Sequence, residues 1–178
     1  MGRKKKIIEF DEQRFSNLST EEKLLLISDF NQLFQYELSK IPYSELNVPK
    51  ENKEKAEIIA KSHFEKLGYD VYQSKINDGY RSIGVIYYWQ EYISKITTAD
   101  FKLIKKIITI LGQDDFKELA YAVKDKNGTP DLLLIKDGEI SFVEVKYNYE
   151  TVKSSTIEFY IKYVHKWAIS ILRVIKQK

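Results

Sequence analysis

The clearest alternation of apolar and polar positions lies in residues 128–146, GTPDLLLIKDGEISFVEVK. Two apolar runs flank an Asp-Gly pair, and a two-residue Asp-Gly loop predicts a β-hairpin with a fixed register. That register places Asp131 opposite Glu144 at the open end of the hairpin. Lys146 falls on the same face, because side chains alternate along a strand.

Helical spacing dominates the first part of the chain. Ser19 and Glu22 form a capping box before an apolar stripe, which predicts a helix over residues 19–38. The preceding KIIEF fits a short strand. The following IPYSELNVPK carries a turn signal, and we expect a new element to start near Pro49.

A second helix is predicted over residues 51–68, and it leads into a strand, YDVYQS. Its apolar face consists of Ala56, Ile59, Ala60, His63, Phe64 and Leu67, and Gly68 supplies the stop. Glu57 lies on the margin of this face and is the acidic residue best placed to look toward a sheet edge, whereas Glu54 and Glu65 point away. The alternative for Glu57 is an exposed helix charge. His63 is expected to be a packed histidine rather than a ligand.

Three more helices are predicted in SIGVIYYWQEYISKI, TADFKLIKKIITILG and DDFKELAYAVKD. The aromatic residues of the first of these fit either stacking on unpaired bases or core and subunit contacts. After the hairpin, TIEFYIKYVHKWAISILRVIK predicts one long helix, or a short strand followed by a helix.

Composition narrows the class of protein. The chain has 178 residues, is 43% hydrophobic and contains no apolar run near the roughly 18 residues of a membrane span. The absence of cysteine excludes disulfides, a thiol nucleophile and cysteine-ligated zinc or iron–sulfur clusters, and makes an intracellular, cytoplasmic setting the expectation, host cytoplasm for a viral protein. With a net charge of +3 and a pI of about 8.7, any nucleic-acid surface must come from local clustering of basic residues. The opening MGRKKK lacks the apolar core of a signal peptide and reads as a solvated tail or a phosphate-contacting arm.

The two opposed carboxylates require an explanation. Like charges directly opposite each other destabilise an antiparallel pair. A divalent cation held by Asp131 and Glu144 would remove the repulsion, and oxygen ligands of this kind suit Mg²⁺ or Mn²⁺. The alternatives are solvated charges at strand ends, or a longer, shifted loop that breaks the pairing.

The segments AEIIAKSHFEKLGYDVYQS, GTPDLLLI and FVEVK resemble, in this order, the PD-(D/E)XK nuclease superfamily. Within it they are similar to archaeal Holliday-junction resolvases and to VRR-NUC domains, over about residues 54–74 and 128–165. The resemblance implies an α/β fold, a restriction-endonuclease-like mixed β-sheet flanked by helices, with a helical N-terminal extension and a helical insertion. The expected organisation is a single nuclease-like domain, 1–178, with an extension at 1–50, a core at 51–74 and 128–178, and the insertion at 75–127.

The resemblance also implies roles for individual residues. Glu57, Asp131 and Glu144 would ligate one or two Mg²⁺ ions, and Lys146 would complete the catalytic site. Gly128 and Thr129 would bring backbone amides toward phosphate.

This sequence departs from many resolvases at VYQSK, where they place a basic residue followed by small ones. Gln73 and Lys75 would substitute there as groups that line the site, together with Thr129.

The predicted function is that of a metal-dependent DNA endonuclease, a hydrolase of phosphodiester bonds. Structure-selective, resolvase-like cleavage would serve recombination, repair, or viral or plasmid replication. The aromatic and isoleucine content of residues 83–111 exceeds what one sheet needs for cover, which predicts a homodimer. The alternative is a non-catalytic nucleic-acid-binding or assembly protein on a nuclease-derived scaffold.

Overall fold

The computed structural model describes residues 19–76, 81–124 and 128–177, and the chain divides into two compact units, Met1–Leu38 and Ser39–Lys178. The described part of the first unit belongs to helix α2 (Thr20–Lys40). The predicted capping box is confirmed, because Ser19 N donates to Glu22 Oε2 at 2.8 Å and Glu22 N donates to Ser19 Oγ at 3.3 Å. The predicted strand KIIEF and the arm MGRKKK lie outside the described residues. Within the described ranges, no helix is both long and apolar enough to cross a membrane.

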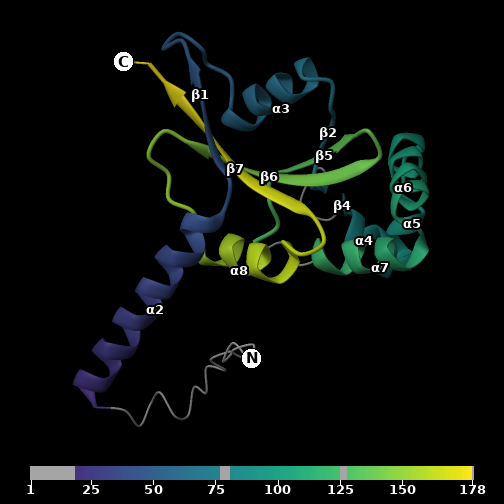
Figure 1. Ribbon diagram of the computed structural model, residues 1–178. Coiled ribbons are helices and arrows are strands. Elements are labelled where there is room, and N and C mark those ends of the chain that lie inside the picture. The colour runs from purple at the N-terminus through teal and green to yellow at the C-terminus, as the bar shows by residue number, and fades with distance from the viewer. Residues whose placement is uncertain (1–18, 77–80, 125–127, 178) are drawn as a thin grey trace. The chain divides into compact units, whose positions relative to one another are not determined.

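A five-stranded mixed sheet organises the second unit (Figure 1). Its order is β1 (Tyr43–Val48), β7 (Ala168–Lys176), β6 (Glu139–Tyr147), β5 (Leu132–Lys136) and β2 (Asp70–Gln73). The β1–β7 and β7–β6 pairs are parallel, and the β6–β5 and β5–β2 pairs are antiparallel. Strands β3 (Lys75–Ile76) and β4 (Arg81–Ser82) form a separate small hairpin.

Helices α3 (Ala56–Lys66) and α8 (Ser154–Tyr163) lie on opposite sides of this sheet (Figure 1). This confirms the predicted class, an α/β fold with a mixed sheet flanked by helices.

The two faces of β6 have different surroundings. Val143 and Val145 belong to the apolar cluster that α3 covers with Ile59 and Ala60. On the other face, the ring of Phe142 meets an aromatic group on the α8 side, with centroid distances of 5.6 Å to Phe159 and 5.8 Å to Trp167. Because side chains alternate along a strand, Glu144 and Lys146 share the face of Phe142.

The hairpin register predicted from the Asp-Gly turn is confirmed. Lys136 pairs with Glu139 and Leu133 with Phe142, and the ladder ends where Leu132 meets Val143. Asp131 therefore lies one residue beyond the paired part of β5, at the position where the register would set it opposite Glu144.

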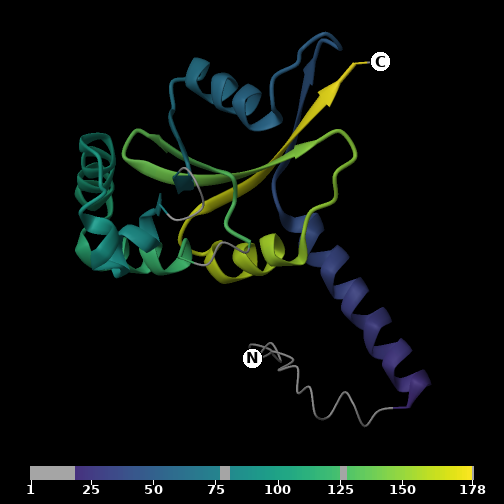
Figure 2. The ribbon, with the colours of Figure 1, turned by 180° about the vertical axis from the view of Figure 1, so that it is seen from behind.

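Helices fill most of the insertion: α4 (Ile83–Tyr88), α5 (Gln90–Ile93), α6 (Thr98–Leu111) and α7 (Gln113–Ala122). The second and third predicted helices are confirmed as α6 and α7. The first is broken in two, because Trp89 adopts an extended backbone conformation with φ −116° and ψ 94°. Both ribbon views place α6 beside the turn of the β5–β6 hairpin (Figures 1 and 2).

Two predictions of local structure were wrong. The segment read as a turn before Pro49 forms strand β1, and the C-terminal helix stops at Tyr163, after which Ala168–Lys176 forms β7. Strand β7 lies between two parallel neighbours and is apolar on both faces, so its run of Ile, Leu and Val does not alternate. Such a run cannot be distinguished from a buried helix by periodicity alone.

Gly84 marks the closest approach of α4 to α7. A Cβ atom at this position would lie 2.1 Å from the Ala120 carbonyl oxygen and 2.6 Å from Lys124 Cα. Replacing glycine by alanine inside a helix normally stabilises it by about 1 kcal/mol. Here we expect Gly84→Ala to lower the free energy of unfolding by about 1–3 kcal/mol, because backbone atoms must move. Urea unfolding of the two proteins tests this, and a stabilised variant would contradict the close packing of these helices.

Candidate active site

Asp131 directly precedes β5, at the open end of the hairpin, where β6 extends beyond its partner strand. Pro130 precedes it and lacks the N–H that would extend the ladder. Strand β6 runs on to Tyr147, paired there with β7 alone. The Val145 N–H on the open side of β6 donates to Asp131 Oδ2 at 2.9 Å, so a carboxylate takes the place of a strand carbonyl. This bond fixes the Asp131 side chain beside the end of the sheet.

Glu144 and Lys146 form a buried ion pair. Their exposed fractions are 5% and 7%, and Lys146 Nζ contacts Glu144 Oε1. Thr156 Oγ1, on α8, donates to the same oxygen at 3.3 Å. A buried charge is tolerated only when it is paired and hydrogen-bonded, and both conditions are met here.

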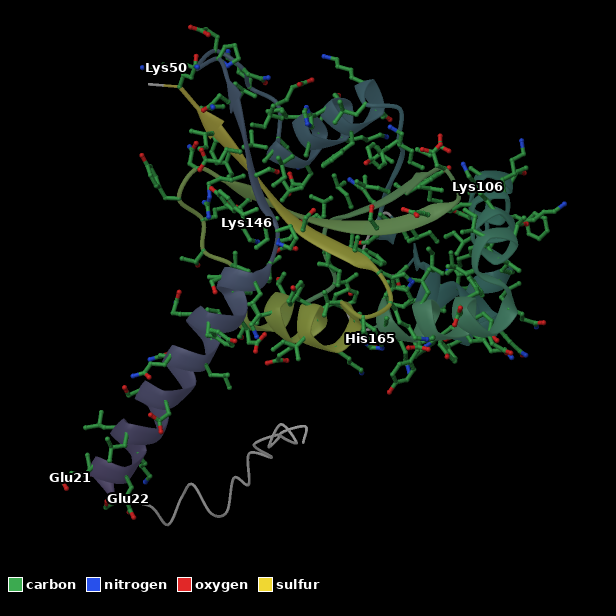
Figure 3. All side chains as sticks on the ribbon, in the orientation of Figure 1. Glu21, Glu22, Lys50, Lys106, Lys146 and His165 are labelled. Atoms are coloured by element: carbon green, nitrogen blue, oxygen red, sulfur yellow. The ribbon has the colours of Figure 1, made fainter. Side chains whose placement is uncertain are left out.

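One pocket of about 630 Å³ brings the predicted residues together. Its lining includes Glu57, Asp131, Glu144, Lys146 and Thr129. Glu57 comes from α3, on the face of the sheet opposite Glu144, so the pocket wraps around the end of β5. Figure 3 labels Lys146 within this part of the second unit.

A smaller cavity of about 350 Å³ adjoins the site on the α3 side and is lined by Glu57, Gln73 and Asp131, among others. Gln73 therefore borders Glu57 and Asp131 in this smaller cavity and does not line the larger pocket. The backbone of Lys75 lies in β3, but its side chain falls outside the described part of the structure. His63 packs edge-on against Phe64, with ring centroids 5.3 Å apart, and lines neither cavity.

The pocket carries excess negative charge around Asp131. Burial raises the pKa of Asp131 to about 6, and the charges of Glu144 and Glu57 add to the increase. The Val145 N–H and the Lys146 ammonium oppose it without cancelling it. A cation near Asp131 would therefore be stabilised.

The donor set suits a hard divalent cation. The acidic residues of the pocket offer carboxylate oxygens only, and the chain contains no cysteine. In the described ranges, no three acidic or histidine side chains stand close enough to form a ready-made metal cage. Mg²⁺ is commonly held by one or two carboxylates with water and substrate phosphate completing its shell, and Asp131 and Glu144 fit this mode.

Several residues that line the pocket were not predicted from the sequence. Thr156 contacts Glu144, and Lys153 and Glu150 line the same space. Tyr149, which is 89% exposed, also lines the pocket. These residues lie in α8 or in the loop before it, without a motif of their own, so only the fold places them beside β6.

Gly128 lines the pocket beside the start of α8. Its φ is +89°, and a Cβ atom would lie 2.2 Å from the Ser155 carbonyl oxygen. The backbone before β5 therefore packs directly on the first turn of α8, and glycine is required there.

Among known proteins, the likeness is one of structure and is distant. No family model and no curated protein matches the chain. A solved structure described as paFAN1 bound to 5′-flap DNA with a two-nucleotide flap and a gap is similar, with 14% sequence identity and a TM-score of 0.49. The likeness covers 78% of this chain and 38% of that one, so this chain spans well under half of that protein.

The raised pKa of Asp131 predicts a pH-dependent gain in stability for Asp131→Asn. The folded pKa of about 6 exceeds the ordinary 3.8, so ionisation of Asp131 destabilises the folded state as the pH rises through this window. The full penalty is present above pH 6 and disappears below 3.8. In EDTA near pH 8 we expect Asp131→Asn to be more stable than the wild type by about 1–2 kcal/mol, and near pH 4 we expect the gain to vanish.

Urea unfolding at both pH values measures this difference. Asp137→Asn provides a matched control, because Asp137 is an exposed turn residue at φ 51°, a conformation that asparagine tolerates. If Asp131→Asn is destabilised at both pH values, the bond to Val145 outweighs the repulsion and the site is not electrostatically strained.

Proposed function

We propose that this protein is a metal-dependent DNA endonuclease that hydrolyses phosphodiester bonds. The observation that carries the proposal is the convergence of Glu57, Asp131 and Glu144 with a buried lysine in one pocket at the end of the sheet. An isolated ion pair would not need two further carboxylates beside it. The order of these residues along the chain is also that of the nuclease superfamily which the motifs resemble.

Asp131 and Glu144, with Glu57 beside them, would hold Mg²⁺ or Mn²⁺. A cation held there would polarise a phosphoryl oxygen, lower the pKa of a bound water and stabilise charge on the leaving oxygen. The Asp131 carboxylate must be ionised to bind a cation, so binding displaces the proton that its raised pKa retains below about pH 6.

Lys146 supplies the positive charge of the protein itself. In the structure its ammonium is paired with Glu144 Oε1 and it lines the pocket. We infer that the ammonium would orient the attacking water and offset charge that develops on the phosphate. Thr156 holds the Glu144 carboxylate in place through its hydroxyl. Lys153 and the backbone at Gly128 and Thr129 line the space that a DNA phosphate would enter.

Glu57 and Glu65 offer a matched test on one helix. Both are glutamates of α3, but Glu57 lines the pocket and Glu65 pairs with Lys61 at 3.8 Å on the outer surface. We expect Glu57→Gln to lower the rate of DNA cleavage by at least about 100-fold, and Glu65→Gln to leave it unchanged. Asp131→Ala, Glu144→Ala and Lys146→Ala should abolish cleavage.

The assay incubates purified protein with linear, nicked, flapped and four-way DNA at several Mg²⁺ and Mn²⁺ concentrations, and circular dichroism checks that each variant is folded. Cleavage by folded Asp131→Ala or Glu144→Ala at the wild-type rate would overturn the site assignment. DNA binding by the wild type without cleavage of any substrate would favour the alternative, a non-catalytic binding or assembly protein.

We further propose a homodimer that prefers branched DNA. The insertion exposes apolar side chains, with Tyr88 at 43%, Trp89 at 48% and Ile93 at 49% exposed. A patch of this kind is commonly covered by a second copy about a two-fold axis. Two sites related by such an axis could cut paired strands of a four-way junction.

Light scattering at micromolar concentration should give twice the mass of one chain. A mass near 21.0 kDa, that of one chain, would exclude a homodimer. Equal cleavage of four-way and linear DNA would exclude a preference for junctions. It would not affect the proposal that the protein is a nuclease.

A further inference from the structure

We propose that α6 and the turn of the β5–β6 hairpin form a second DNA contact, a lysine-lined pocket that binds backbone phosphates away from the acidic pocket. The inference rests on the proposed function in taking DNA as the ligand. We call this feature the lysine pocket. It is lined by Lys102, Lys105, Lys106, Thr109 and Ile110 of α6, by Gly68 and Asp70, and by residues 135–138 of the hairpin, and its volume is about 610 Å³.

The lysines of α6 lie on one stripe of the helix. Lys102, Lys105 and Lys106 are followed by Thr109, at spacings of three, four and seven residues from the first, which is the repeat of a single helix face. The apolar side of α6 buries Leu103 and Ile107 against the rest of the insertion. The helix thus packs through one face and directs a row of cations at the hairpin turn through another.

Two of the lysines are held in place. Lys106 Nζ contacts the Asp70 carboxylate at the start of β2. Lys136 Nζ, on β5, donates to the Leu67 carbonyl at 2.8 Å and lies 4.9 Å from the centroid of the Tyr69 ring. Both ammonium groups are therefore fixed at the rim by local contacts.

The other two lysines have no such restraint. Among the described residues, Lys102 and Lys105 take part in no ion pair, and both are exposed. Four lysines line this pocket against two aspartates, Asp70 and Asp137, so its net charge is positive. A lysine ammonium binds phosphate as a point charge.

The acidic pocket and the lysine pocket carry opposite charges and would bind different groups. The acidic pocket would hold a cation and the scissile phosphate, but its carboxylates repel the rest of the DNA backbone. The lysine pocket offers the opposite charge at the other end of the hairpin, and Figure 3 shows Lys106 far from Lys146 across the second unit. The overall charge of +3 is small, so this local cluster is where phosphate attraction can concentrate.

The length of the hairpin sets the spacing of the two pockets. Asp131 and Asp137 lie six residues apart along β5, which corresponds to about 20 Å of extended strand. Duplex DNA rises about 3.4 Å per base pair, so a duplex that contacts both pockets at once would extend about six base pairs from the cleaved bond.

Fluorescence anisotropy with a labelled 20-base-pair duplex in EDTA tests the lysine pocket without any cleavage. Each phosphate contact contributes about 0.9 to the slope of log K against log salt, so Lys102→Ala combined with Lys105→Ala should lower the slope by about 1.8. Lys61→Ala combined with Lys66→Ala is the matched control, because it removes the same charge from exposed positions of α3 outside this pocket. The control should keep the wild-type slope.

If the two double variants show the same slope and the same affinity for DNA, the inference is wrong. This outcome does not depend on whether the wild type cleaves DNA. A reduced slope in the α6 variant alone supports the lysine pocket, even if the protein cleaves no DNA. Failure of the nuclease proposal can therefore be distinguished from failure of this inference.

Discussion

The acidic pocket depends on the unequal length of two paired strands, β5 and β6. Strand β5 begins only after Pro130, whereas β6 runs on to Tyr147, so the N–H of Val145 faces a position that β5 does not fill. A buried N–H needs an acceptor, and the Asp131 carboxylate provides it. The same requirement that completes the sheet therefore brings a carboxylate next to Glu144, at a cost that is visible in the raised pKa of Asp131.

The other elements respond to this concentration of negative charge. Lys146 follows Glu144 by two residues on the same face of β6 and neutralises it, and Thr156 of α8 adds a hydrogen bond. Helix α3, on the other side of the sheet, adds Glu57 around the end of β5. The pocket thus combines residues from both faces of the sheet at the point where the sheet is incomplete. The positive charge of α6 gathers at the other end of the same hairpin.

Local sequence signals predicted the parts of the site that depend on short-range geometry. The Asp-Gly turn fixed the register and hence the neighbourhood of Asp131 and Glu144, and helical spacing placed Glu57 at the margin of the packed face of α3. The contact of Thr156 with Glu144 could not be predicted, because it depends on which helix covers that face of the sheet. Strand β7 was misread for a related reason, since burial on both faces removes the alternation that identifies a strand.

Direct measurement of Mn²⁺ binding by electron paramagnetic resonance tests the central claim, that the incomplete edge of the sheet forms a cation site. The wild-type protein should bind Mn²⁺ near pH 8, binding should weaken below about pH 6 as Asp131 takes up a proton, and Asp131→Asn should remove it. Asp137→Asn, which changes an exposed turn carboxylate, should bind Mn²⁺ as the wild type does. Equal binding by the wild type and Asp131→Asn, or no binding by the wild type, would show that the incomplete edge of the sheet is not a cation site.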